Sequence, residues 1–151
     1  MPDTPIADLT LPASSGKTFN FAEHHGKKLV LYFYPKDATP GCTTEAQEFR
    51  DLHAEFERAG CVVYGISRDS LKSHENFKAK QRLPFDLLSD ADETACQQLG
   101  VIKMKNLYGK QVRGIERSTF VFYQEGVLRR EWRGVKVPGH AQEVLDFVKS
   151  L

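Results

Sequence analysis

Cysteine is scarce in this sequence, and no two cysteines form a recognisable pair. Only three of the 151 residues are cysteine, at positions 42, 61 and 96. An odd number of widely spaced cysteines argues against a secreted disulfide framework, and a zinc site needs clustered Cys and His ligands. We therefore expect a cytoplasmic protein whose thiols start out reduced.

The chain also lacks an excess of charge and any long apolar run. Its 21 basic and 20 acidic residues nearly cancel, so charge makes no case for nucleic acid or an anionic membrane as the main partner. No apolar run approaches the roughly 20 residues of a membrane span, and the first 16 residues lack a signal-peptide pattern. Because the sequence contains no internal repeat or linker, we expect residues 1–151 to form one domain.

Apolar runs and helical periodicity alternate along the chain. Continuous apolar runs predict buried strands, and residues 126–134 predict a hairpin partner for the last of them. The expected strands cover residues 29–35, 61–67, 118–123 and 126–134; the expected helices cover a segment ending near Gly60 and residues 72–81, 93–99 and 140–151. A small N-terminal hairpin is expected to turn at Ser15-Gly16. This order predicts an α/β domain with a mixed sheet.

Cys42 opens the first predicted helix, in the stretch PGCTTEAQEF. Thr39 is a good N-cap and Pro40 suits the first helical position, so Cys42 falls in the first turn. The unpaired N–H groups and the helix dipole there favour a thiolate. Ala46 and Phe49 share its face, which should turn the sulfur toward the protein body. The alternative is a small apolar filler.

Several cysteine chemistries do not fit this stretch. A dithiol oxidoreductase needs a second cysteine at position 45, which is Glu45. A phosphatase loop needs arginine at position 48, which is Glu48. A cysteine hydrolase needs a histidine base that spacing alone does not place. Direct attack of a thiolate on a peroxide remains.

The stretch PKDATPGC carries the pattern P-x-x-x-T-x-x-C as Pro35, Thr39 and Cys42. It resembles the active-site motif of the peroxiredoxins. The segments GISRDS, SHENF, LLSDAD and YGKQVRGIERSTF extend the resemblance to the bacterioferritin comigratory protein, or Q-type, subfamily. The resemblance implies a thioredoxin-like fold, with a central mixed sheet flanked by helices and an N-terminal β-hairpin extension. It also implies a monomer or weak dimer that needs no metal, haem or flavin.

The same resemblance implies a peroxidase that reduces hydrogen peroxide and organic hydroperoxides, and it assigns roles to individual residues. Cys42 would be the peroxidatic cysteine and form a sulfenic acid. Thr39 would hydrogen-bond the peroxide, Pro35 would shield the pocket, and Arg117 would hold the thiolate and the peroxide oxygens. Glu45 also matches the subfamily; we interpret it as a first-turn carboxylate that favours the helix dipole, not as a catalytic group.

The sequence departs from the subfamily where a second, resolving cysteine is expected. The two usual positions are occupied by Gln47 and Lys78. We therefore expect a one-cysteine mechanism in which thioredoxin, or glutathione with glutaredoxin, supplies the thiol. Cys96 as an unusual internal resolving cysteine is the alternative mechanism, and Cys61 is expected to be a core residue. The rival function is a non-enzymatic peroxide sensor or redox-dependent binding module.

Overall fold

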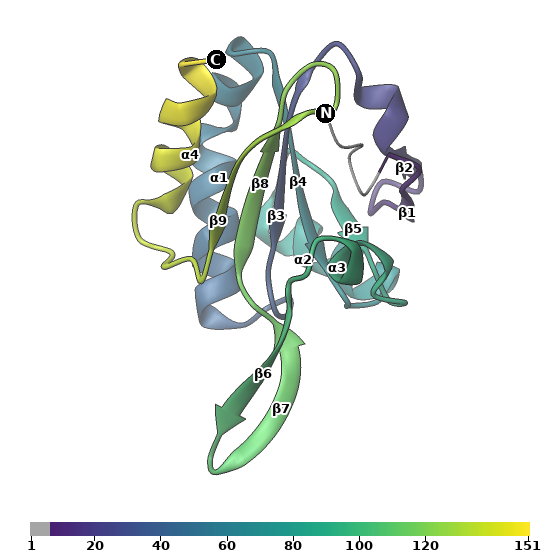
Figure 1. Cartoon of the computed structure of the whole chain (residues 1–151), viewed down its shortest axis with the longest axis vertical. Coiled ribbons are helices and arrows are strands. Elements are labelled where there is room, and N and C mark those ends of the chain that lie inside the picture. Colours follow the sequence, from purple (N-terminus) through teal and green to yellow (C-terminus); the bar gives the residue numbers. More distant parts are fainter. Residues whose placement is uncertain (1–6) are drawn as a thin grey trace.

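A five-stranded mixed sheet lies at the centre of the computed structural model, which describes residues 7–151 (Figure 1). The strand order is β5-β4-β3-β8-β9, with β3, β4 and β5 parallel and β8 and β9 antiparallel to their neighbours. The strands are β3 (Lys28–Phe33), β4 (Cys61–Ser67), β5 (Leu87–Ser89), β8 (Ser118–Phe122) and β9 (Leu128–Arg133). The predicted strands and the β8–β9 hairpin are confirmed, and β5 was not predicted.

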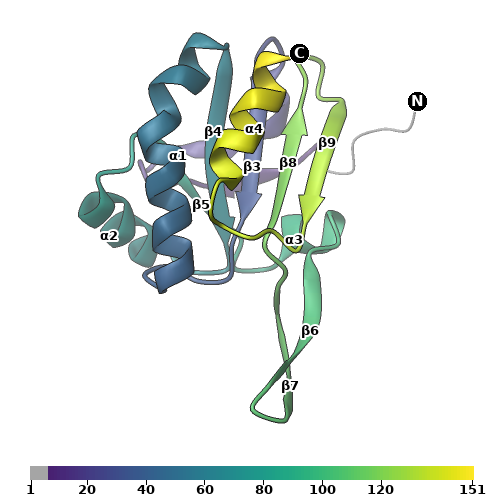
Figure 2. The ribbon, with the colours of Figure 1, turned by 90° about the vertical axis from the view of Figure 1, so that its left-hand side faces the viewer.

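The sheet separates two apolar layers because side chains alternate along each strand. From β3, Leu31 and Phe33 enter one layer, whereas Val30 and Tyr32 enter the other. Helices α1 (Pro40–Arg58) and α4 (His140–Lys149) lie side by side over the second layer (Figure 2). The predicted apolar face of α4, which includes Val144, is fully buried there.

The opposite face of the sheet is covered by the N-terminal segment and a short helix. The predicted N-terminal hairpin is confirmed, and its two strands pair through Leu11 and Phe19. These elements are β1 (Thr10–Pro12), β2 (Thr18–Asn20), the 3-10 helix η1 (Phe21–His24) and α3 (Thr94–Gln98). Helix α2 (Leu71–Gln81) packs beside β5. Residues 1–6, part of the stretch searched for a signal peptide, lie outside the described residues.

A second hairpin projects beyond the sheet and was not predicted. Strands β6 (Ile102–Leu107) and β7 (Lys110–Ile115) pair only with each other and extend past the end of β3 (Figures 1 and 2). Tyr108 and Gly109 form the two-residue turn, with φ angles of 53° and 80°. Two positive φ values give the turn the twist that antiparallel strands require. Among residues 7–151, no helix is long and apolar enough to span a bilayer.

Candidate active site

Cys42 lies where the chain leaves the end of β3 and enters α1. Thr39 occupies the N-cap position and Pro40 begins the helix, as predicted, and the side chain of Cys42 is only 2% exposed. The sulfur therefore faces the protein body. The hydroxyl of Thr39 does not cap the helix, however; it donates to the carbonyl of Lys36 at 2.9 Å. Thr39 therefore occupies the predicted N-cap position, but its side chain does not form a capping hydrogen bond. Pro35 lies in the same loop and is half-buried.

Arg117 reaches Cys42 from the neighbouring strand. Ser118 pairs with Phe33 in the antiparallel β8–β3 ladder, so the residue before β8 lies beside the loop that follows β3. Its Nη2 atom donates to the Cys42 sulfur at 3.4 Å. Gly41 makes room for this approach, because a Cβ atom there would lie 3.3 Å from Nη2. A permanently charged guanidinium beside the sulfur stabilises negative charge on it.

Glu45 is the second partner of Arg117, and the sequence-based interpretation of it was wrong. It lies beyond the first turn of α1, is 1% exposed, and its Oε1 atom accepts a hydrogen bond from Arg117 Nη1 at 2.6 Å. Burial raises the pKa of Glu45 to about 7, although Arg117 acts in the opposite direction. Burial disfavours the charge on Arg117, but Glu45 and Cys42 outweigh that effect and raise its pKa. Glu45 therefore orients the guanidinium toward the sulfur.

The loop before Cys42 is anchored to α2 by a buried network. The Asp37 carboxylate accepts hydrogen bonds from the Tyr34 hydroxyl at 2.6 Å, Ser73 at 2.8 Å and His74 Nδ1 at 2.7 Å. Nε2 of His74 lies 2.9 Å from the Leu88 carbonyl, so both ring nitrogens have a hydrogen-bond partner. Burial opposes the charge on Asp37, but its bonds to His74 and Tyr34 lower its pKa below the ordinary value.

This network explains a cluster that resembles a metal site. The ligand atoms of Asp37, Asp69 and His74 lie within 4.8 Å of one another. Asp69, however, already accepts hydrogen bonds from the Asp37 backbone N–H and the Ser67 hydroxyl. Both nitrogens of His74 are also engaged. The cluster therefore serves to fix the loop, including Ala38, whose φ of 64° is unfavourable for a residue with a Cβ atom.

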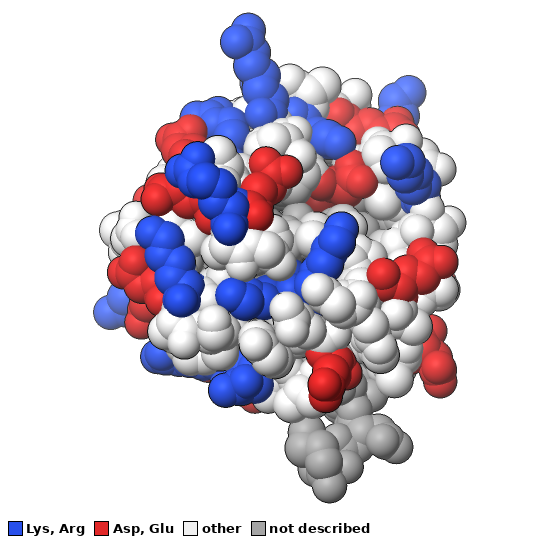
Figure 3. Space-filling model, turned by 90° about the horizontal axis from the view of Figure 1, so that it is seen from above, with Lys and Arg blue, Asp and Glu red and all other residues white. Residues whose placement is uncertain are grey.

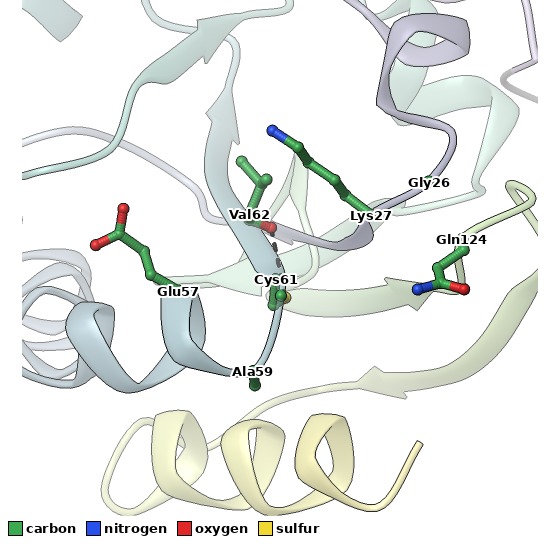
Figure 4. Close-up of a pocket in the computed structure, with 8 residues that line it drawn as sticks. Gly26, Lys27, Glu57, Ala59, Cys61, Val62 and Gln124 are labelled. Carbon is green, nitrogen blue, oxygen red and sulfur yellow. Dashed lines mark hydrogen bonds between the residues drawn. The ribbon is translucent and has the colours of Figure 1, made fainter.

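Cys61 lies at the opposite end of α1 from Cys42. From Cys42 to Arg58 the helix advances by 16 residue steps, which is about 24 Å at 1.5 Å per step. Cys61 borders an open pocket of about 270 Å³ with Lys27, Glu57 and Gln124 among its lining residues (Figure 4). Its Sγ atom lies 3.7 Å from the Val62 carbonyl.

Cys96 lies on the other face of the sheet from Cys42. It is fully buried in the apolar layer that contains Leu31 and Phe33, whereas Cys42 belongs to the layer under α1. Burial and a hydrogen bond with Asp90 raise the pKa of Cys96 far above its usual range. The structure thus brings together Cys42, Arg117 and Glu45, and it brings neither other cysteine to this group.

The two positions where a resolving cysteine was expected are engaged in other contacts. Gln47 Nε2 donates to the Gln81 side chain at 2.9 Å, which links α1 to α2. Lys78 Nζ forms an ion pair with Asp86 at 2.7 Å. Both side chains therefore help to hold the helix α2 in place.

The chain is similar to known proteins in both sequence and structure. Residues 2–131 match the model of the AhpC/TSA family. The chain is 54% identical over 143 residues to the peroxiredoxin Bcp of Xanthomonas campestris, covering 95% of this chain and 89% of that protein. It is 47% identical over 144 residues to the peroxiredoxin Bcp of Bacillus subtilis, covering 95% and 92%.

Solved structures show the same similarity. A structure of the Xanthomonas campestris bacterioferritin comigratory protein, from work on its alkyl peroxide reduction activity, has a TM-score of 0.93 and 51% identity, covering 99% of this chain and 96% of that one. Peroxiredoxin 6 of Arenicola marina has a TM-score of 0.78 at 18% identity, covering 95% and 69%. The latter similarity concerns the fold alone.

Proposed function

Because this chain belongs to the AhpC/TSA family, among the peroxiredoxins of Bcp type, it is a thiol peroxidase, and we propose that Cys42 is its peroxidatic cysteine. The thioredoxin-like fold that the resemblance implied is confirmed by the structural neighbours. The observation that carries the assignment is the 3.4 Å contact between Arg117 Nη2 and the Cys42 sulfur. A thiolate in the first turn of a helix, paired with a fixed cation, is the nucleophile that this reaction needs.

The proposed first step is attack of the Cys42 thiolate on one oxygen of the peroxide. The S–O bond forms as the O–O bond breaks, and the departing oxygen takes a proton and leaves as water or an alcohol. Cys42 becomes a sulfenic acid. Negative charge moves from sulfur to oxygen during this step, and Arg117 is placed to stabilise it in both positions.

Thr39 and Pro35 complete the proposed pocket. The Thr39 hydroxyl already has its proton directed to Lys36, which leaves its oxygen lone pairs to accept a hydrogen bond from the peroxide O–H. Pro35 limits access from the loop side. The Xanthomonas relative is described by its alkyl peroxide reduction activity, so the proposed substrates are organic hydroperoxides as well as hydrogen peroxide.

Regeneration of Cys42 requires a second thiol. Cys61 lies at the far end of α1, and a Cys42–Cys96 disulfide would require one segment to leave its face of the sheet, because bonded cysteines have Cα atoms within about 7 Å. The proposed route is therefore a one-cysteine cycle with thioredoxin, or glutathione with glutaredoxin, as the reductant in the cytoplasm. Cys96 as an internal resolving cysteine is the alternative route. A monomer or weak dimer suffices for either.

Peptide mapping by mass spectrometry after one equivalent of hydrogen peroxide, without reductant, tests this proposal. We expect one added oxygen, trapped by a sulfenic-acid reagent at Cys42, with Cys61 and Cys96 still free. A Cys42–Cys96 disulfide would establish the alternative route. Oxygen on Cys61 or Cys96 with Cys42 unchanged would contradict the assignment of the peroxidatic cysteine.

A further inference from the structure

The projecting β6–β7 hairpin concentrates the exposed apolar surface of the molecule. Among the side chains whose exposure the structure describes, three large apolar ones are exposed, and all three lie on this hairpin: Met104 at 59%, Val112 at 42% and Tyr108 at 98%. Exposed apolar surface on a projecting element can contribute to an interaction site. Six-residue strands make the arm about 20 Å long at roughly 3.3 Å per residue.

The charges on the same hairpin are all positive. Residues 102–115 contain Lys103, Lys105, Lys110 and Arg113 and no acidic residue. The opposite end of the molecule differs, because basic and acidic side chains alternate over its surface (Figure 3). The hairpin is therefore a basic arm on a chain whose formal net charge is only +1.

The strand register sorts these side chains into two faces. Lys105 is opposite Val112, so Lys103, Lys105, Lys110 and Val112 share one face, called here the lysine face. Met104 is opposite Arg113 on the other face, where Arg113 is paired with Glu93. Arg113 is thus paired with an acidic residue on one face, and the three lysines gather on the other, the lysine face.

The base of the lysine face lies near Cys42 and Arg117. Strand β7 ends two residues before Arg117, and Lys105 Nζ donates to the Ile115 carbonyl at 2.6 Å. Burial and the nearby charge of Arg117 lower the pKa of Lys105, whereas the charge of Cys42 acts in the opposite direction. A molecule bound along this face would therefore lie beside the sulfur that must be reduced.

We propose that the lysine face is the docking surface for the reductant, and that the reductant is a protein dithiol whose reactive cysteine is surrounded by acidic and apolar surface. This inference rests on the proposed function of Cys42. One thiol of the partner attacks the Cys42 sulfenic acid, forms a mixed disulfide and releases water. The partner's second thiol then breaks that disulfide, which leaves reduced Cys42 and an oxidised partner.

The extent and charge of the arm favour this occupant over others. A tripeptide thiol such as glutathione is too small to contact the whole length of an arm of about 20 Å that carries apolar side chains. A second copy docked face to face would place lysines against lysines, which is unfavourable. A nucleic acid would match the charge, but its binding gives no thiol to Cys42.

Charge reversal on the arm tests the proposal. In Lys103→Glu/Lys110→Glu, we expect the KM for a reduced protein dithiol, thioredoxin or glutaredoxin, to rise about tenfold at low ionic strength, because complementary charges become like charges. The effect should shrink at high salt, where exposed charges are screened. Turnover with dithiothreitol and the rate of Cys42 oxidation by peroxide should stay within about twofold of wild type, because neither needs the arm.

The matched control is Lys17→Glu/Lys27→Glu, which makes the same change in net charge at exposed positions away from the arm. Tyr108→Ser tests the apolar tip separately, and we expect it to raise the same KM. The docking proposal fails if the arm variant and the control have equal KM values, if glutathione alone matches both protein dithiols, or if wild type is a dimer that the arm variant dissociates. Absence of turnover even with dithiothreitol would instead refute the peroxidase function.

Discussion

Cys42 and Cys61 lie at opposite ends of α1 and are almost equally buried, at 2% and 3% exposure, yet their surroundings differ completely. Burial raises the pKa of Cys61 to about 12, and Lys28 only weakly offsets it. Cys42 instead has a helix N-terminus and a guanidinium 3.4 Å from its sulfur. Burial alone makes a thiol inert, whereas burial with a fixed cation prepares a nucleophile.

Removal of the sulfur is the strongest test of this comparison. We expect Cys42→Ser to lower the rate of peroxide reduction by at least about 10⁴-fold, because an alcohol lacks the nucleophilicity of a thiolate. Cys61→Ala and Cys96→Ala should keep the rate within about twofold when a protein dithiol is supplied. Stopped-flow measurement of peroxide consumption provides the comparison. A loss of dithiol-supported turnover in Cys96→Ala would favour the internal resolving route.

Removal of the cation should make Cys42 behave more like Cys61. We expect Arg117→Gln to slow oxidation of Cys42 by about 10²- to 10³-fold, since a charged donor to the reacting atoms is lost. Arg117→Lys should recover part of this loss, because it keeps the charge but not the two-pronged geometry. Arg129→Gln, an exposed arginine on β9, is the control. Equal rates for Arg117→Gln and the control would remove Arg117 from the site.

Glu45, near the Cys42 end of α1, should make the stability of the protein depend on pH. Its pKa is raised from 4.5 to about 7 in the folded protein, so the folded state holds a proton that the unfolded chain has released. This contribution to stability is present below about pH 4.5 and is lost as the pH rises through 7. The free energy of unfolding of Glu45→Gln minus that of wild type should therefore increase by about 3 kcal/mol from pH 4.5 to 7.

Urea unfolding at several pH values measures this difference. Glu55→Gln, which removes a half-buried carboxyl from the same helix far from Glu45, is the matched control. A difference between Glu45→Gln and wild type that does not change with pH would show that Glu45 keeps its ordinary protonation behaviour.

The smallest expected effect concerns the room around Arg117. In Gly41→Ala the new Cβ atom would lie 3.3 Å from Arg117 Nη2, so the guanidinium must shift by a few tenths of an ångström. We expect the rate of Cys42 oxidation to fall by about two- to fivefold, because the reacting groups lose their alignment. Stability should not fall, since alanine is a better helix former than glycine. A normal rate would mean that the pocket tolerates this shift.

The sequence predicted those strands and helices whose apolar pattern lies within one continuous run of residues. The apolar runs of β3, β4 and β8 and the periodicity of α1 and α4 mark elements that bury one or both faces, and burial is what hydrophobic patterning reports. Strand β5 has only three residues, and the projecting β6–β7 hairpin buries little. Neither produces a strong pattern, although the Tyr108-Gly109 turn was a usable signal for the hairpin.

The site was predicted in part. The position of Cys42 behind Thr39 and Pro40 is a local property, because helix capping depends on neighbouring residues. Arg117 was found only through the resemblance to a family, since nothing in its neighbours distinguishes it from a surface arginine. The buried partner of Arg117, Glu45, was misinterpreted because helix position alone does not reveal what lies opposite.

By itself, therefore, the sequence determined the long buried strands and helices, the helix start that carries Cys42, and the absence of a cysteine at the two expected resolving positions. The tertiary structure alone decided that Arg117 and Glu45, 72 residues apart, meet at the sulfur, that Asp37 anchors the loop to α2, and that the sheet separates Cys96 from Cys42. The physical reason is that local chemistry specifies backbone conformation, whereas charge pairing and burial depend on the strand register that brings distant segments together.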